Sequence, residues 1–144
     1  MVFATAYRIA GNAADAEDVL HTVFLRLLRH GERVIAQPES YLRRAAVNAA
    51  LDLVKSRRFV PADLDQMEAP PENSGQSDLR DALRNALARL PGRTAEAFAL
   101  RYFEDLRNPE IAELLGLTRV GVAVTLHRAR RMLKEELIKA GVRP

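Results

Sequence analysis

The chain has 144 residues, of which 48% are hydrophobic and 6% aromatic, and it contains no cysteine. This length fits one domain or two small ones, and the lack of cysteine excludes disulfides and thiolate zinc sites. No apolar run could span a membrane and no signal-peptide pattern opens the chain, so we expect a cytoplasmic protein. The three histidines are scattered without ligand spacing, and we therefore expect neither a metal nor a cofactor.

Charge is unevenly distributed along the chain, although the net charge is only +3. Residues 1–60 carry nine basic and six acidic side chains, and residues 79–144 carry thirteen and eight. Residues 61–78 between them carry five acidic side chains and no basic ones. Two basic blocks favour a polyanionic partner, bound in a salt-dependent way. The alternative is that these charges only solvate helix faces, which is the usual role of surface charge.

The N-terminal part shows helical periodicity and no strand signal. A first helix is predicted over about Val2–Ala10 and stops at Gly11. A second is predicted over about Ala14–His30, with acidic residues in its first turn and basic residues in its last, as the helix dipole favours. A third is predicted from near Pro38 to about Arg58. These three helices form one small helical domain, residues 1–59.

An acidic segment with three prolines follows, and we predict a flexible linker over residues 60–77. Helical patterning resumes near Ser77–Asp78 and breaks at Pro91–Gly92, after which Thr94 is expected to cap a short helix. The second domain then covers residues 78–144. The predicted fold is all-α, with two small helical domains joined by the acidic linker.

Residues Asn108 to Arg131 have the pattern of a helix-turn-helix, a motif whose second helix enters the major groove of DNA. We expect Asn108 to cap the first helix, and Pro109 suits its first turn. Gly116 can take the left-handed backbone that ends it, and Thr118 can cap the second helix. The alternative is an ordinary helical hairpin packed in a core.

Segments of both halves resemble bacterial extracytoplasmic-function (ECF) sigma factors, in the order that this family has them. Those similar to region 2 are DAEDV (15–19), FLRLLR (24–29), YLRRAAVNAALD (41–52) and KSRR (55–58). Those similar to region 4 are Leu90–Pro91, LRYFEDL (100–106), EIAELLGL (110–117) and LHRARRML (126–133). The resemblance covers nearly the whole chain and implies a factor that binds core RNA polymerase and directs it to promoters.

The resemblance also implies roles for the two domains. The first would grip the clamp helices of the polymerase β′ subunit and would recognise and open the promoter −10 element. The second would sit under the β flap and read the −35 element. An anti-sigma protein or another regulator is a further implied partner. The loop 31–37 lies where ECF sigma factors hold a flipped base.

Candidate residues follow from these roles and from residue chemistry, since Asn, Lys and Arg donate to base edges and phosphates. Those expected at the −10 element are Arg43, Arg44, Asn48, Asp52, Lys55, Arg57 and Arg58. Those expected at the −35 element are Thr118, Arg119, Val122, Ala123, Thr125, Arg128, Arg130 and Arg131. Those expected at the polymerase are Asp15, Glu17, Asp18, His21, Thr22 and Leu25. For Asn48 and Asp52, spaced four apart on one helix face, capping or pairing within the bundle remains the alternative.

The chain departs from the family pattern in three places. Its first predicted helix corresponds to the family's second. His21 and Thr22 stand where the family commonly has Gln and an acid, and Ala123, Val124 and Thr125 replace residues that are often basic or polar. These departures keep two alternatives open: a degenerate sigma-like interaction protein and a simple helix-turn-helix repressor. No phosphate-binding loop, nucleophile motif or metal-ligand set indicates an enzyme.

Overall fold

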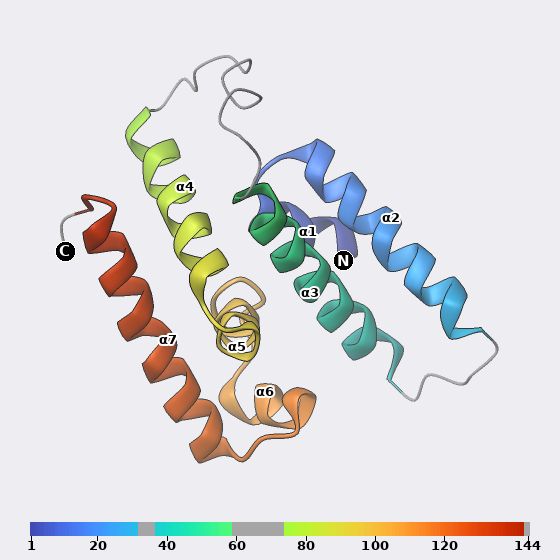
Figure 1. Cartoon of the computed structure of the whole chain (residues 1–144). Helices are drawn as coiled ribbons and strands as arrows, with labels where there is room; N and C mark the ends of the chain where they lie inside the picture. The colour runs from blue at the N-terminus through green and yellow to red at the C-terminus, as the bar shows by residue number, and fades with distance from the viewer. Residues whose placement is uncertain (32–36, 59–73, 143–144) are drawn as a thin grey trace.

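The computed structural model describes residues 1–31, 37–58 and 74–142, with the side chains of 58 and 74–78 left aside. Within these residues the chain forms seven α-helices and no strand, so the all-α prediction is confirmed (Figure 1). The helices are α1 (Val2–Ala10), α2 (Ala13–His30), α3 (Pro38–Arg58), α4 (Ser74–Arg89), α5 (Gly92–Tyr102), α6 (Asn108–Leu115) and α7 (Arg119–Lys139).

Local capping signals explain the boundaries in the N-terminal part. Helix α1 ends at Gly11, which has φ 89° and donates its N–H to the Tyr7 carbonyl at 2.8 Å. That left-handed conformation costs glycine little, because it has no Cβ. Helix α2 then begins behind Asn12, whose side-chain oxygen accepts the Asp15 N–H at 2.8 Å. Strong local signals of this kind make helix ends predictable from sequence.

Two boundaries in the C-terminal half differ from the prediction. Helix α4 already begins at Ser74, inside the predicted linker, and residues 60–73 of that linker lie outside the described part. Thr94 does not cap α5, because the helix starts at Gly92 with Pro91 as its N-cap. The Thr94 side chain is buried within the helix. Proline fixes φ near the value that a helix start needs, which moves the start ahead of the threonine.

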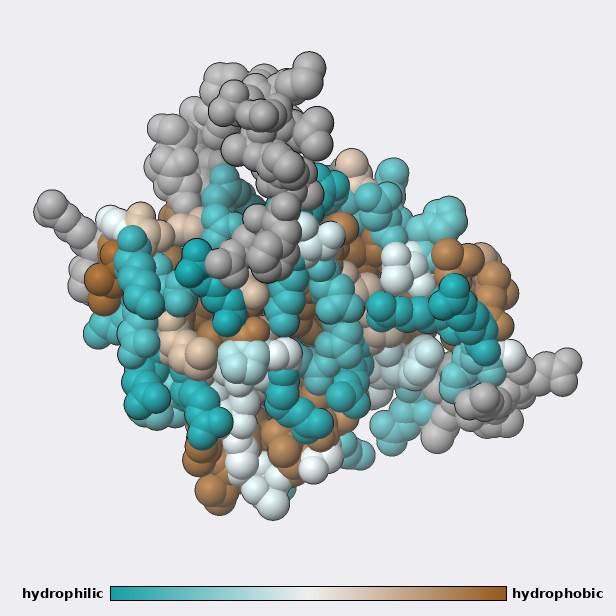
Figure 2. All heavy atoms as spheres, viewed as in Figure 1, coloured by the Kyte–Doolittle hydropathy of each residue, from teal (hydrophilic) through white to brown (hydrophobic). Residues whose placement is uncertain are grey.

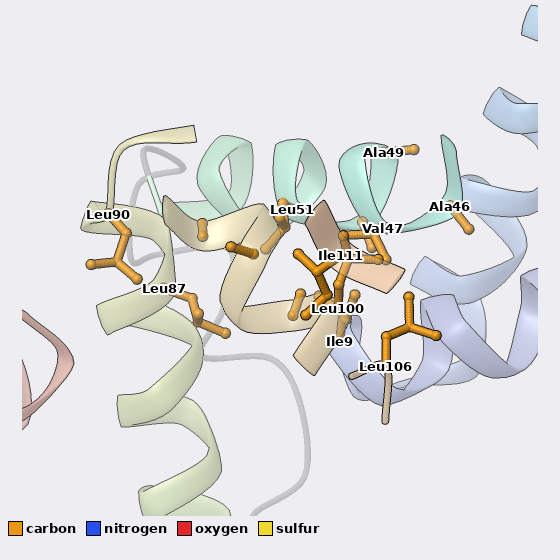
Figure 3. Close-up of a cluster of buried hydrophobic side chains, with 14 of the residues drawn as sticks. Ile9, Ala46, Val47, Ala49, Leu51, Leu87, Leu90, Leu100, Leu106 and Ile111 are labelled. Carbon is orange, nitrogen blue, oxygen red and sulfur yellow. The ribbon is translucent and has the colours of Figure 1, made fainter. Parts of the chain in front are cut away.

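The seven helices form two groups that pack through α3. Helices α1, α2 and α3 contact one another, as do α5, α6 and α7, and α3 lies against both α4 and α5 (Figure 1). One buried cluster runs through both groups, and Figure 3 shows Ile9, Val47, Leu100 and Ile111 meeting from α1, α3, α5 and α6. Burying such side chains is worth about 1.5–3 kcal/mol each. The shared core therefore holds α3 directly against the C-terminal helices.

Candidate nucleic-acid interface

Helices α6 and α7 and their turn have the geometry of a helix-turn-helix. Helix α6 ends at Gly116, whose φ of 67° is left-handed, and the Leu117 N–H closes the turn on the Ala112 carbonyl at 2.9 Å. Thr118 caps α7 as predicted, since its hydroxyl accepts the Gly121 N–H at 2.9 Å. Asn108 is not the cap of α6: Arg107 holds that position, and its N–H donates to Glu110 Oε1 at 3.1 Å.

Helix α7 has a buried face and an exposed basic face. Val122, Leu126, Ala129 and Leu133 lie in the core, and Val122 is 0% exposed. The prediction that Val122 contacts DNA is therefore wrong for this arrangement, because the spacing that puts Leu126 in the core puts Val122 there too. Arg119, Ala123 and Arg128 are exposed, as is Arg131. Thr125 is half-buried, and its hydroxyl donates a hydrogen bond to the Gly121 carbonyl at 2.7 Å.

Most arginines of α7 are not paired with another side chain in the described part of the chain. Arg130 donates to the Tyr102 hydroxyl at 2.6 Å, which ties it to α5. Among the residues that the structure describes, Arg119, Arg128 and Arg131 make no side-chain hydrogen bond or ion pair. Exposed guanidinium groups on one helix are well suited to phosphates, which they bind through two parallel hydrogen bonds.

Two arginines of α3, Arg43 and Arg44, are in contrast already paired with the C-terminal half. Arg44 Nε donates to Glu96 Oε1 at 3.2 Å, and its Nη1 donates to the Leu114 carbonyl, also at 3.2 Å. Arg43 lies 3.5 Å from Glu39 and 3.7 Å from Glu104. The carboxylates of Glu96 and Glu104 are only 6% and 2% exposed. A buried carboxylate is costly without a cation beside it, so these arginines are held in place.

Glu104 is the centre of this contact, and sequence reasoning did not single it out. It accepts hydrogen bonds from Thr5 and from Arg8 Nη2, the latter at 2.6 Å, both in α1. Glu96 was missed in the same way. In the sequence, Glu96 and Glu104 do not differ from other acidic residues on or after a helix. They become partners of arginines only because distant helices pack together.

Three of the remaining predicted −10 residues gather around a hollow between α3 and α5. Asn48, Asp52 and Lys55 line a cavity of about 200 Å³ together with Arg44 and Glu96. Asp52 also lies 3.7 Å from Arg26 of α2. Arg57 pairs with Asp15, while the Arg58 side chain and residues 32–36 of the predicted flipped-base loop lie outside the described part. In this arrangement α5 faces the hollow that the predicted −10 residues line.

Helix α2 presents the predicted polymerase-binding residues. Glu17, Asp18 and His21 are exposed, and Thr22 donates its hydroxyl to the Asp18 carbonyl at 3.0 Å. Asp15 was predicted to contact the polymerase, but it is buried and hydrogen-bonded to Arg57. In this arrangement it is therefore not available to a partner. Leu20, Phe24, Leu25 and Leu28 are exposed on the same helix, and Figure 2 shows hydrophobic side chains at that edge of the molecule. An exposed apolar patch of this kind is typical of a protein-binding surface.

Two other kinds of feature are absent from the described part of the chain. Within the described residues, no three His, Cys, Asp or Glu side chains are placed to hold a metal ion. No helix among those residues is long and apolar enough to cross a membrane.

Comparison with protein families places both halves of the chain. Residues 1–60 match the family model described as sigma-70 region 2, and residues 80–133 match sigma-70, region 4. The ECF RNA polymerase sigma factor SigL of Mycobacterium tuberculosis is 33% identical over 95% of this chain and 82% of its own length. The chain belongs to the ECF sigma factor family. This family consists of transcription initiation factors and not of enzymes.

Other relatives agree with this assignment. The ECF sigma factor SigE of Mycolicibacterium smegmatis is 34% identical over 96% of this chain, which spans 58% of that relative. A sigma factor RpoE, solved in complex with the anti-sigma factor NepR from Bartonella quintana, has the same fold, with a TM-score of 0.54 and 20% identity. That likeness covers 94% of this chain and 89% of RpoE.

Proposed function

We propose that this ECF sigma-family chain binds bacterial core RNA polymerase in the cytoplasm and directs it to specific promoters. The observation that carries the proposal is the pair of family matches in order, one over α1–α3 and one over the helix-turn-helix half. Neither a simple repressor nor an enzyme needs a region 2 half. In this proposal residues 1–59 and 74–144 act as two units joined by the residues between them.

The −35 element is assigned to α7. Arg119 lies in its first turn, where recognition helices contact base edges, and Arg128 and Arg131 are exposed further along for phosphates. Ala123 is exposed and small, which suits close approach to an apolar group such as a thymine methyl. Thr118 and Arg130 have structural roles in this proposal: Thr118 caps α7, and Arg130 links α7 to α5.

The −10 element is assigned to α3, through Arg43, Arg44, Asn48 and Lys55. Because α5 packs against α3 and its Glu96 holds Arg44, this assignment requires the two halves to separate on the polymerase. The carboxylates that now neutralise the arginines would then be replaced by DNA phosphates. The polymerase clamp is assigned to α2, through Glu17, Asp18, His21 and the exposed apolar side chains that follow them. A regulatory protein that binds the chain is proposed by analogy with the RpoE complex.

Transcription in vitro tests the proposal. Core RNA polymerase and a pool of genomic fragments are incubated with and without the chain, and transcripts are sequenced from their 5′ ends. We expect new start sites preceded by two shared elements at fixed distances. If no start site depends on the chain, the proposal is wrong.

A matched pair of variants tests the α2 surface. Leu25 and Leu79 are similarly exposed, at 46% and 51%, but lie on α2 and α4. Leu25→Asp should reduce binding to core polymerase about tenfold or more, because it places a charge in an apolar contact. Leu79→Asp should leave it unchanged within about twofold. Equal losses would contradict the assignment of α2.

One observation favours a second candidate function. The exposed side chains of α7 include Val120 and Val124, which offer DNA no hydrogen bonds. A degenerate sigma-like interaction protein would bind polymerase without selecting promoters. In the same experiment, polymerase binding without new start sites would identify it.

A further inference from the structure

A cavity of about 430 Å³ lies between α1, α4 and the residue that follows α5. Its lining includes Tyr7, Arg8, Gly11, Arg80, Arg84 and Phe103. None of these residues belongs to the α2, α3 or α7 surfaces assigned above. The volume falls within the range of about 300–1,000 Å³ that is usual for sites that bind small molecules, and such sites often lie between packed units.

Arg84 is fixed in this cavity by contacts with both halves of the chain. Its Nε donates to the Ile9 carbonyl at 3.1 Å, and its Nη1 donates to Asp81 at 3.1 Å. Its guanidinium lies directly over Gly11, where a Cβ would come within 1.9 Å of Nη2. The glycine therefore makes room for the cation, and the Nη2 donors are not used in either of these bonds.

Two further arginines line the cavity with unused donors. Arg8 bonds Glu104 through Nη2 alone, although a guanidinium has five N–H donors. Arg80 is exposed and, within the described part of the chain, makes no side-chain hydrogen bond or ion pair. The carboxylates paired with these arginines are Glu104, whose side chain is buried beside Arg8, and Asp81, whose side chain is exposed beside Arg84. Three cations against two anions leave the cavity positive.

The cavity also has aromatic walls. The Tyr7 ring is exposed and stacks on Phe3, with ring centroids 6.2 Å apart, and Phe103 is half-buried. Flat rings bind other flat rings by stacking, as aromatic side chains do with nucleic-acid bases. Arginines from α1 and α4 beside such rings form a combination suited to a ligand with both an anionic and a planar part.

We propose that this cavity binds a small phosphorylated ligand with a planar ring, of the size of a nucleoside diphosphate. The phosphates contact Arg80 and the free donors of Arg8 and Arg84, and the ring lies against Tyr7 and Phe103. Because Arg8 and Arg84 come from different halves, the ligand binds the packed arrangement and stabilises it. The proposal does not depend on promoter recognition and is tested on the chain alone.

Calorimetric titration with adenosine diphosphate, inorganic pyrophosphate and adenosine tests both parts of the ligand. We expect saturable one-to-one binding of adenosine diphosphate, about tenfold weaker binding of pyrophosphate and none of adenosine. Arg80→Ala should weaken diphosphate binding about tenfold through the loss of charge-assisted bonds. Arg131→Ala removes the same charge from exposed α7 and should change it less than about twofold.

Tyr7→Ala separates the ring from the phosphates. It should weaken the binding of adenosine diphosphate but leave the binding of pyrophosphate unchanged. Melting curves check that the Arg80→Ala and Tyr7→Ala variants fold. The proposal is overturned if adenosine diphosphate does not saturate at millimolar concentration, or if Arg80→Ala and Arg131→Ala lose affinity equally. Equal affinities for pyrophosphate and adenosine diphosphate would overturn the assignment of the rings.

Discussion

The basic surfaces of α3 and α7 differ in what their arginines contact. Arg43 and Arg44 of α3 face buried carboxylates of the other half, whereas Arg128 and Arg131 of α7 face solvent. Both surfaces have the residue chemistry of a nucleic-acid interface, but only α7 presents it in the structure as it stands. Whether an arginine-rich surface can bind nucleic acid therefore depends on whether its arginines are already paired within the chain, as well as on their presence.

The largest effect is expected where the α3 arginines are removed. Arg43→Ala with Arg44→Ala leaves Glu96 buried without its cation, which costs roughly 3–5 kcal/mol for a fully buried pair. Because the Arg44 side chain is 39% exposed, we expect about 2 kcal/mol in the free energy of unfolding by urea.

The matched control removes the same charge from α7. Arg128→Ala with Arg131→Ala should change stability by less than about 0.5 kcal/mol, as is usual for exposed sites. Equal losses in the two double variants would show that the α3 and α7 arginines do not differ as described.

The next effect concerns duplex DNA. Arg131→Ala should weaken binding to a −35 duplex about tenfold at low salt and lower the slope of log affinity against log salt by about 1, because one phosphate contact is lost. Fluorescence anisotropy over a salt series measures both quantities. Arg29→Ala, an exposed arginine in the last turn of α2, serves as the control. A similar drop for Arg29→Ala would mean that only net charge matters.

A smaller effect is expected at the start of α7. Thr118→Ala removes the hydroxyl that accepts the Gly121 N–H and should destabilise the chain by about 1 kcal/mol in thermal unfolding. Thr118→Ser keeps the oxygen and should retain most of the stability. If serine and alanine behave alike, the cap does not hold the recognition helix.

The smallest effect is expected when a carboxylate is neutralised in place. Glu96→Gln keeps the size of the side chain but weakens its hold on Arg44, so single-stranded DNA should bind about threefold more tightly. Glu113→Gln makes the same charge change on the exposed side of α6. Binding of a labelled oligonucleotide measures both variants, and equal gains would attribute the effect to net charge.

The sequence predicts this molecule best where the decisive interaction is local. Gly11, Gly116 and Thr118 act within a few residues of their own position, and the helix ends predicted at them agree with the structure. The burial of Val122 likewise follows from the apolar spacing of α7, and the predicted DNA contact of Val122 does not fit that spacing.

Long-range pairing could not be predicted in this way. Glu104 meets Thr5 and Arg8, and Glu96 meets Arg44, across large separations in the sequence. Nothing in the composition around Glu104 distinguishes it from Asp105 beside it, yet the Glu104 side chain is only 2% exposed, whereas Asp105 is exposed. Only the contacts that α1 and α3 make with Glu104 decide which acid is neutralised within the chain.

The end of α6 carries a consequence for how the two halves communicate. Its last carbonyls, those of Leu114 and Leu115, accept hydrogen bonds from Arg44 of α3 and from Arg93 of α5. Cations at a helix C-terminus stabilise it through the helix dipole. Any partner that takes Arg44 away thus weakens the first helix of the helix-turn-helix. By reciprocity, a partner that stabilises α6 in a geometry without Arg44 makes α3 easier to engage. Under the proposed function, occupancy at one promoter element would then be felt at the other.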